Sequence, residues 1–394
     1  MLDIVIQNNE DKTKEIILIN NGQLVEYYKE LEKNNRKEGN IYIGIVKDVI
    51  KGMQSAFIDI GTEKNSFIHL KDALPKVDET KGTVDENIEI SDVLKKGQKI
   101  LVQLKKDSNE KKGARVSSHI NLPGKYIALM PNTDIVTVSQ KIEDKEEQKR
   151  LVKLVKENLS QGNGAVIRTL AKGKEKEIIE DIKKVEEKWS NIISTNIDVD
   201  NKKPQLIYTS EEIVGKMIID ISEESNIKIT VNNKEEQKKI LDNIKIEKYS
   251  NVEVEYLNKS ELFKEKGILS EVEKVENNKI WLKSGGFIKI DKTEALTAID
   301  VNTGKYTGKE NLEKTVFLVN KEATVEIAKQ LRLKDIGGIV IIDYIDMKKN
   351  QNKKEIEELL KKELKKDRAK TQVEGFTKLE LMEMTRKHIC SHND

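Results

Sequence analysis

Apolar residues gather in short runs at the start of the chain. MLDIVIQ at 1–7 and KEIILIN at 14–20 have the length and composition of strands, and NNGQ at 20–23 predicts a turn. LVEYYKELEK at 24–33 is amphipathic, so we expect a helix there. Two strands and a helix cannot bury a core alone, so this segment should pair with a later part of the chain.

From residue 36 to 118 the pattern changes to short strands at close spacing. NIYIGIVKDVI, SAFIDIG and NSFIHL are separated by glycine-containing turns, and GQKILVQLKKD and NEKKGARVSS complete the series. The polar, acidic loop at 75–91 is expected to be mobile. This arrangement is typical of a small antiparallel barrel.

Two aromatic residues of the expected barrel, Phe57 and Phe67, allow two interpretations. In the first interpretation both phenylalanines fill the barrel core, which is the commoner role of such residues in an arbitrary barrel. Alternatively, both stack on nucleic-acid bases at an open face, with Lys105, Lys106 and Lys112 holding phosphates. The pattern alone leaves both interpretations open.

Residues 119–210 show a mixed α/β pattern. Strands are expected at YIALMP and DIVTVS, a helix at 144–159, and a strand in GNGAVIRTL, followed by a second long helix. Arg168 and Thr169 stand where that last strand ends. A guanidinium fork and a hydroxyl beside a glycine turn can hold a phosphate, although an ordinary strand end is the commoner explanation.

Residues 211–276 alternate helices with the strands IKITVN and VEVEYL. This segment is the natural partner for the N-terminal strands. If the two pair, then residues 36–210 are inserted within one discontinuous domain.

The final part, 277–394, contains a hairpin with a Ser-Gly-Gly turn and the strand EALTAIDVN, whose alternation puts Asp300 and Asn302 on one face. A helix is expected over 315–335. The run IVIIDYID then predicts a buried strand with Asp343 on one face and Asp346 on the other. A long charged helix and a last helix, TKLELMEMTRK at 377–387, should follow.

Two carboxylates, Asp300 and Asp343, each follow an apolar run. A strand–helix–strand crossover favours neighbouring or near-neighbouring strands, so both acids should lie close together at one sheet edge with Asn302 one pleat away. Two carboxylates and an amide are hard oxygen ligands that suit Mg²⁺ with retained waters. For Asp300 taken alone, the competing interpretation is a strand-end residue that caps a turn.

Composition narrows the classes of protein without naming a partner. Charged residues make up 36% of the 394, but 71 basic and 69 acidic side chains leave a net charge of only +2, so any basic surface is local. With the single cysteine Cys390 no internal disulfide forms, and no apolar run reaches membrane-spanning length, so we expect a cytoplasmic protein without a membrane span. The ending HICSHND is too short and irregular for a zinc site, and we expect a frayed tail.

At these residues the sequence resembles the ribonuclease E/G family. The family's catalytic signature is resembled by EALTAIDVNTG, AKQLRLKDIGGIVIIDYIDM and KKDRAKTQ. Its OB-fold barrel of the ribosomal-protein S-one type is resembled by NIYIGIVKDVIKGMQSAFIDIG together with KKGARVSS. Its 5′-sensor is resembled by LMPN and GNGAVIRT. The similarity extends from about residue 1 to 387.

The resemblance implies an α+β multidomain fold. It consists of a discontinuous ribonuclease H-like domain (1–35 plus 211–276), an inserted OB-fold RNA-binding barrel (36–118) and 5′-sensor domain (119–210), and a DNase I-like α/β catalytic domain (277–394).

The resemblance also implies roles for single residues. Asp300 and Asp343 become Mg²⁺ ligands, with Asn302 supporting the scissile phosphate. Arg168, Thr169 and the backbone at Ala128 become a pocket for a 5′-monophosphate. The implied RNA contacts are Phe57, Phe67, Lys112 and Lys370; at Lys370 the family commonly has arginine, whose bidentate geometry lysine lacks.

The implied function is a Mg²⁺-dependent endoribonuclease that cuts single-stranded, A/U-rich RNA. It would prefer 5′-monophosphorylated ends and would act on ribosomal RNA precursors and messenger RNA. The family usually continues with a zinc link of CPxCxG type and a small dimerisation domain. Here the sequence stops at Asp394, so we expect no zinc site, and a homo-oligomer remains possible without a zinc-linked dimer. The alternative function is an RNA-binding protein without catalysis that uses the barrel and the sensor.

Overall fold

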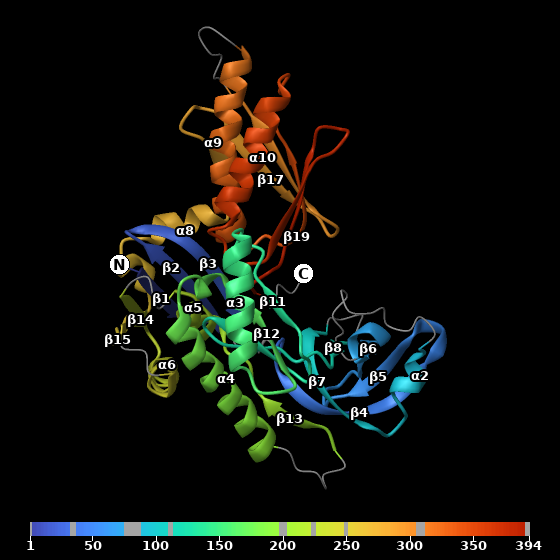
Figure 1. Cartoon of the computed structure of the whole chain (residues 1–394). Coiled ribbons are helices and arrows are strands. Elements are labelled where there is room, and N and C mark those ends of the chain that lie inside the picture. Colours follow the sequence, from blue (N-terminus) through green and yellow to red (C-terminus); the bar gives the residue numbers. More distant parts are fainter. Residues whose placement is uncertain are drawn as a thin grey trace. The chain divides into compact units, whose positions relative to one another are not determined.

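The computed structural model of the chain (Figure 1) describes residues 2–31, 37–74, 88–108, 113–196, 203–221, 226–247, 251–304 and 312–390. Contacts divide the chain into two compact units, one formed by Met1–Asn35 with Ile213–Asp394 and the other by Arg36–Glu212. Lys112 and most of the acidic loop, residues 75–87, lie outside the described residues. The finer division into four domains stays a prediction.

The first unit contains a five-stranded sheet that joins distant parts of the sequence. Its strand order is β15-β14-β1-β2-β3, with bounds β1 Leu2–Asn8, β2 Thr13–Asn20, β3 Gln23–Leu31, β14 Ile227–Val231 and β15 Val252–Tyr256. Strand β1 runs parallel to β14 and antiparallel to β2. The N-terminal strands therefore find their pairing partner more than 200 residues later in the chain.

Both faces of this sheet are covered by helices. Apolar residues of α5 (Ile213–Ile221) and α6 (Lys234–Glu247) pack against one face, and those of α7 (Leu262–Glu265) and α8 (Leu269–Val275) against the other. Burial on both faces explains the nearly continuous apolar runs of β1 and β2.

The helix expected at 24–33 is wrong over its described part, because residues 24–31 belong to β3. Leu24, Glu26 and Tyr28 are buried at every second position, which is the period of a strand. Pairing with β2 along its whole length fixes this conformation in spite of the helix-favouring residues.

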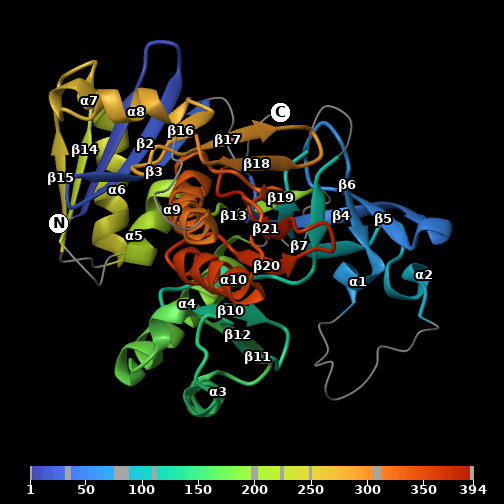
Figure 2. The same ribbon diagram turned by 90° about the horizontal axis from the view of Figure 1, so that it is seen from above.

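The first unit also contains a six-stranded sheet, β16-β17-β18-β19-β21-β20, which we call the catalytic sheet after the role that the sequence resemblance implies for it. Its strands are β16 Lys279–Trp281, β17 Phe287–Lys292, β18 Thr297–Asn302, β19 Gly338–Asp343, β20 Thr371–Phe376 and β21 Met382–Arg386. Helices α9 (Leu312–Leu333) and α10 (Asn350–Leu364) lie side by side and share one apolar core with the sheet (Figure 2). Only one face of the sheet packs on these helices.

Two further expectations for this part are wrong. The last predicted helix is strand β21, because Met382, Met384 and Arg386 are buried at every second position. The frayed tail expected for the last seven residues is wrong for residues 388–390. The side chain of Cys390 is buried in the core of the sheet that contains β1, β2 and β3. The carboxylate of Asp335 accepts the backbone N–H groups of Ile389 and Cys390 and holds this end in place.

The second unit contains a five-stranded barrel closed by pairing between β4 and β7. Its strands are β4 Ile41–Ile50, β5 Ser55–Asp59, β6 Ser66–His69, β7 Lys99–Lys106 and β8 Arg115–Ser117; β13 (Gln205–Tyr208) pairs with β4 outside the ring, and short helices lie at η1 Lys51–Met53, α1 Leu70–Ala73 and α2 Ile90–Val93. A small closed barrel is consistent with the expected OB-like domain.

The remainder of the second unit is a four-stranded sheet, β11-β12-β10-β9, with two helices. The bounds are β9 Leu122–Pro123, β10 Ile127–Pro131, β11 Val136–Val138, β12 Asn163–Ile167, η2 Thr169–Ala171, α3 Lys145–Asn158 and α4 Glu175–Asn196. Helix α3 begins after Asp144, whose carboxylate accepts the backbone N–H groups of Glu146 and Glu147 as an N-cap. In the described part of the chain, no helix has both the length and the apolar character needed to cross a membrane.

Candidate functional site

Asp300 and Asp343 lie directly beside each other on the catalytic sheet. Strands β18 and β19 are parallel, and Asp300 is the register partner of Asp343. Neighbouring strands are about 4.8 Å apart, and side chains at paired positions point to the same face. The neighbours Ile299, Val301 and Ile342 face the helices, so both carboxylates point to the opposite face. The structure thus brings the two predicted acids together.

Asn302 completes this group from the same strand. Its Nδ2 donates a hydrogen bond of 2.5 Å to Asp300 Oδ2. This bond uses one of the two amide hydrogens, and it leaves the second hydrogen and the carbonyl oxygen for another partner. Alternation along β18 therefore delivers a carboxylate and an amide to one face, as the sequence predicted.

Helix α9 fixes the chain immediately after Asp343. The buried side chain of Asn320 donates to the carbonyl oxygen of Ile345 and accepts its N–H, at 2.8 and 3.2 Å. The Tyr344 hydroxyl lies 2.9 Å from Thr324 Oγ1. The polar side chains buried in this helix therefore hold the carboxyl end of β19, and Asp343 with it.

The turn between β16 and β17 is held against the end of β18. Glu322 of α9 accepts the backbone N–H groups of Lys283 and Ser284 at 2.5 and 3.1 Å. A Cβ on Gly286 would stand 2.7 Å from the Asn302 carbonyl oxygen, and one on Gly304 would stand 2.3 Å from the Gly285 carbonyl oxygen. Only glycine permits backbones to approach this closely.

The electrostatics of the pair reflect two like charges side by side. Partial burial, followed by the charges of Asp300 and Asp346, raises the pKa of Asp343 above its ordinary value. Neither Asp300 nor Asp343 forms an ion pair within the described residues. A divalent cation would remove this repulsion.

The placement expected for Asp346 on the opposite face is wrong. Strand β19 ends at Asp343, so strand alternation does not extend to Asp346, and the charge of Asp346 acts on Asp343. The strand is also not buried on both faces, because Ile339 is half exposed and only Val340 and Ile342 face the core.

The donor chemistry of the pair fits a hard cation such as Mg²⁺. Two carboxylates and an amide oxygen offer only oxygen ligands, and Mg²⁺ commonly takes one or two carboxylates and completes its shell with water and substrate phosphate. Among the described residues, no group of three or more acidic, histidine or cysteine side chains could hold a metal ion. Water and substrate would therefore have to supply the remaining ligands.

Arg168 and Thr169 stand at the end of β12 in the second unit. Arg168 Nη1 donates to the carbonyl oxygen of Gly124 at 2.7 Å, and the Thr169 hydroxyl lies 3.0 Å from that of Ser139. Ala128 lies on the neighbouring strand β10 and pairs with Val166. Of the three predicted phosphate-binding residues, Ala128 thus lies on β10, and Arg168 and Thr169 directly follow the adjacent strand β12.

Two residues that support this region were missed from the sequence. The buried carboxylate of Asp181 accepts the backbone N–H groups of residues 125–127 at 2.7–3.0 Å and so shapes the turn that receives Arg168. Burial raises the pKa of Asp181 above its ordinary value, although Arg168 and the N–H donors oppose this. Ser139 adds a hydroxyl beside Thr169. Neither residue belongs to a motif, so no local pattern marks it.

The two predicted aromatic contacts lie on the outer face of the barrel. Phe57 on β5 and Phe67 on β6 are register partners, and Phe57 is 41% exposed. The barrel core is built instead from neighbours such as Ala56, Ile58 and Ile68. The interpretation in which both phenylalanines fill the core is therefore wrong.

Two of the lysines expected to contact RNA differ in how far their side chains are already engaged by the protein. Lys105 Nζ is engaged by the carbonyl oxygen of His119 and by Gln103 Oε1, at 2.6 and 2.7 Å. Lys370 is exposed and its carbonyl oxygen pairs with Lys387, at the end of the catalytic sheet where β19 begins. Asp343, at the other end of β19, is about 16 Å further along the strand.

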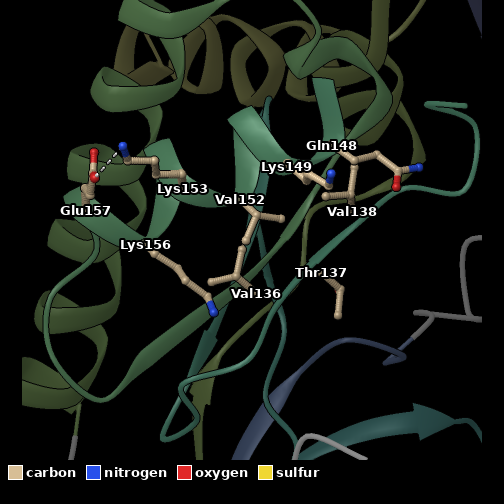
Figure 3. Close-up of a pocket in the computed structure, with 9 residues that line it drawn as sticks. All are labelled: Val136, Thr137, Val138, Gln148, Lys149, Val152, Lys153, Lys156 and Glu157. Atoms are coloured by element: carbon tan, nitrogen blue, oxygen red, sulfur yellow. Dashed lines mark ion pairs between the residues drawn. The ribbon is translucent and has the colours of Figure 1, made fainter. Parts of the chain in front are cut away.

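A shallow pocket of about 760 Å³ lies between β11 and α3 (Figure 3). It is lined by Val136, Thr137, Val138, Gln148, Lys149, Val152, Lys153, Lys156 and Glu157. None of the predicted site residues lines it, and Lys153 is paired with Glu157.

Comparisons with known proteins agree on one family. A family model described as "Ribonuclease E/G family" matches residues 121–389. Ribonuclease G of Escherichia coli (strain K12) is 36% identical over 381 residues, which cover 94% of this chain and 77% of that protein. Ribonuclease G of Haemophilus influenzae is 36% identical over 394 residues, covering 97% and 79%. Ribonuclease E of Nostoc sp. is 31% identical over 391 residues, covering 95% of this chain and 56% of that protein.

Proposed function

The chain belongs to the ribonuclease E/G family and is an endoribonuclease, and we propose that Asp300 and Asp343 hold a divalent cation at the phosphodiester that is cut. The observation that carries this proposal is the register pairing of two carboxylates on one face. Like charges paired across strands are unfavourable. Neither carboxylate forms an ion pair among the described residues, since the neighbouring Lys289 is ion-paired with Asp291, and such a pair favours a cation-binding role. The oxygen donors favour Mg²⁺.

The residues of the pair have separate tasks in this proposal. When bound, the cation supplies Lewis acidity toward the phosphodiester and lowers the pKa of a water. Asn302 holds Asp300 through one amide hydrogen and offers the second to an oxygen of the scissile phosphate. Asn320 and Tyr344 keep Asp343 at its place on the strand end. Attack of water on phosphorus leaves a 5′-phosphate and a 3′-hydroxyl.

Most of the residues proposed to hold RNA belong to the second unit. There, Phe57 and Phe67 stack on bases and Lys112 contacts a phosphate, and Lys370 of the first unit contacts another. The exposure of Phe57 supports this role. Arg168, Thr169 and the backbone at Ala128 receive a 5′-monophosphate, which gives a preference for RNA with that end.

The substrates proposed from the family are single-stranded, A/U-rich segments of ribosomal RNA precursors and messenger RNA in the cytoplasm. A homo-oligomer is compatible with this proposal, but a zinc-linked dimer forms no part of it. The order β3-β2-β1-β14-β15, with three antiparallel strands followed by two parallel ones, supports a ribonuclease H-like domain. The catalytic sheet supports the assignment of 277–394 as a DNase I-like domain.

The central test replaces each acid by its amide. Asp300→Asn and Asp343→Asn should each lower the rate of Mg²⁺-dependent cleavage of single-stranded RNA by about a thousandfold, corresponding to several kcal/mol of lost transition-state stabilisation. RNA affinity should stay within about threefold. Asp291→Asn, on the same sheet face but outside the pair, is the matched control. Undiminished cleavage by either amide variant refutes the site.

A second test addresses the 5′ end. With 5′-monophosphorylated RNA, Arg168→Ala should lower kcat/KM about tenfold, because a charge-assisted hydrogen bond contributes about 1.5–3 kcal/mol. RNA with a 5′-hydroxyl should be cut equally by both proteins. A preference for the monophosphate that survives this substitution rules out the role of Arg168.

A further inference from the structure

A pair of aromatic side chains lies beside Asn302 on the open face of the catalytic sheet. Trp281 on the edge strand β16 is the register partner of Phe287 on β17, and Phe287 is the register partner of Asn302 on β18. The three side chains therefore form one row across the strands. With usual strand spacing, Trp281 is about 10 Å from Asn302.

The next row on the same face joins cationic side chains to the carboxylates. Lys279 pairs with Lys289, Lys289 with Asp300, and Asp300 with Asp343. Lys279 Nζ lies 4.6 Å from the ring centre of Trp281 and 3.9 Å from that of Phe287. The aromatic rings thus share their surface with a lysine that lies in the same row as the proposed metal ligands.

Packing does not account for Trp281. Its side chain is 63% exposed, whereas its neighbours Ile280 and Leu282 contact the core and anchor the β16 hairpin. Exposed edge strands usually carry charged or polar residues, because an apolar edge promotes aggregation. The chain contains only two tryptophans, and one of them stands in the open beside the proposed site.

Charged side chains are distributed unevenly over the open face of the sheet. The strands on the β17 side of the carboxylate pair carry Lys279 and Lys289, of which Lys289 is ion-paired with Asp291. Glu374 and Glu383 are exposed on β20 and β21 at the other side. A polyanion is attracted toward the lysines and repelled from the glutamates. The aromatic rings therefore lie on the flank that an RNA chain would follow.

The aromatic pair is also rigidly placed with respect to Asn302. The turn that joins β16 to β17 is held by Glu322 and packs against the backbone at Asn302 and Gly304. The rings contact each other edge to face, with centres 5.3 Å apart. A binding surface on regular strands, fixed by such contacts, orders its ligand precisely.

We propose that Trp281 and Phe287 stack on bases of single-stranded RNA next to the scissile phosphate, while Lys279 contacts the adjoining phosphate. This inference rests on the proposed function of Asp300 and Asp343. We call Trp281 and Phe287 the stacking platform. Stacking recognises the flat surface of a base and not its edge, so this platform requires a base but accepts any of the four. It would set which phosphodiester reaches the carboxylate pair.

The test uses short single-stranded RNAs that lack the base at one position, moved step by step across the cleavage site. With the unchanged protein, removal of the base at one position beside the cut should lower kcat/KM roughly ten- to hundredfold. Trp281→Ala should lower kcat/KM on intact RNA by a similar factor and lose its sensitivity to that position, and Trp281→Phe should restore part of both. Leu318→Ala, an exposed apolar residue on α9, is the matched control.

Equal cleavage of intact RNA by Trp281→Ala and the unchanged protein overturns the platform. So does a Trp281→Ala variant that keeps its full sensitivity to every missing base. Unfolding in urea, compared with Leu318→Ala, identifies any loss that comes from misfolding, and Trp281→Phe then carries the test.

A binding measurement separates this inference from the proposed catalysis. In an Asp343→Asn protein, intact single-stranded RNA should quench tryptophan fluorescence, and the quenching should disappear in Asp343→Asn with Trp281→Phe. Quenching without any cleavage by the unchanged protein would defeat the proposed catalysis and leave the platform standing. Cleavage without Trp281-dependent quenching would defeat the platform alone.

Discussion

Carboxylates occupy two contrasting settings in the first unit. Glu26 is buried and receives hydrogen bonds of 3.0 and 2.7 Å from Arg368. Although burial raises the pKa of Glu26, the charge and hydrogen bonds of Arg368 outweigh it, and the pKa lies below its ordinary value. Asp343 has an acidic neighbour instead, and its pKa is raised. A carboxylate beside a cation holds the fold together, whereas a carboxylate beside another carboxylate is available for a ligand.

A second buried group follows the first pattern. The guanidinium of Arg386 is fully enclosed and bridges Asp335 and Asp367 at 2.8 Å each. This group joins the end of β21 to the loop after α9 and to the loop after α10. Substitutions in these buried ion pairs and in the Asp300–Asp343 pair test this contrast.

The largest effect on stability is expected from Arg386→Met. It leaves two aspartates buried without a cation, so the free energy of unfolding should fall by about 3–5 kcal/mol in urea denaturation. Lys361→Met, which removes an exposed ion pair with Glu357, should cost at most about 0.5 kcal/mol. If both variants lose the same small amount, the buried group has no special structural role.

Glu26→Gln tests the same setting through pH. The pKa of Glu26 is lowered in the fold, so its contribution is present above pH 4.5 and is lost as pH falls through the folded pKa. At pH 7 the variant should be about 3 kcal/mol less stable. This gap should narrow below pH 4.5 in urea titrations at a series of pH values. A gap that does not change with pH contradicts the lowered pKa.

Binding of Mg²⁺ to the Asp300–Asp343 pair should stabilise the fold. At ten times the dissociation constant, Mg²⁺ should add about 1.4 kcal/mol to the free energy of unfolding, seen as a higher melting temperature. Asp343→Asn should abolish this increase, whereas Asp291→Asn should retain it. An equal increase in both variants would place the cation elsewhere.

The smallest effect is expected from Asp343→Asn without metal. Removing one of two paired like charges should stabilise the fold by up to about 1 kcal/mol. Because the pKa of Asp343 is raised in the fold, its ionisation costs stability as pH rises from 3.8 through the folded pKa. The advantage of the variant should therefore be absent at lower pH and grow across that window. A destabilised variant at neutral pH contradicts the repulsion.

The sequence predicted the elements that carry the proposed metal ligands. In β18 the apolar side chains of Ile299 and Val301 alternate with Asp300 and Asn302, and this period of two cannot be read as a helix. The crossover through α9 predicted that β18 and β19 are neighbouring or near-neighbouring strands, and the structure shows that they pair directly. Local pattern and topology together were sufficient for this site.

Other elements depended on contacts that the sequence does not display. The segments that form β3 and β21 are rich in Glu, Lys, Leu and Met, which favour helices, and they have apolar residues at both helical and strand spacing. Pairing with β2 and β19 decided their conformation. In the same way, the importance of Asn320 and Asp181 lies in partners far along the chain. The position of Trp281 in one row with Phe287 and Asn302 follows only from the register of three strands.

The pairing of β18 with β19 limits which changes of length the chain can accept. Inserting or deleting one residue within β18 would turn Asp300 toward the helices and Ile299 toward solvent, because successive side chains alternate. A two-residue change would keep the faces correct but move Asp300 one row away from Asp343. Length changes in this strand should therefore be tolerated far less than substitutions, and an engineered loop is better placed in the turn that precedes it.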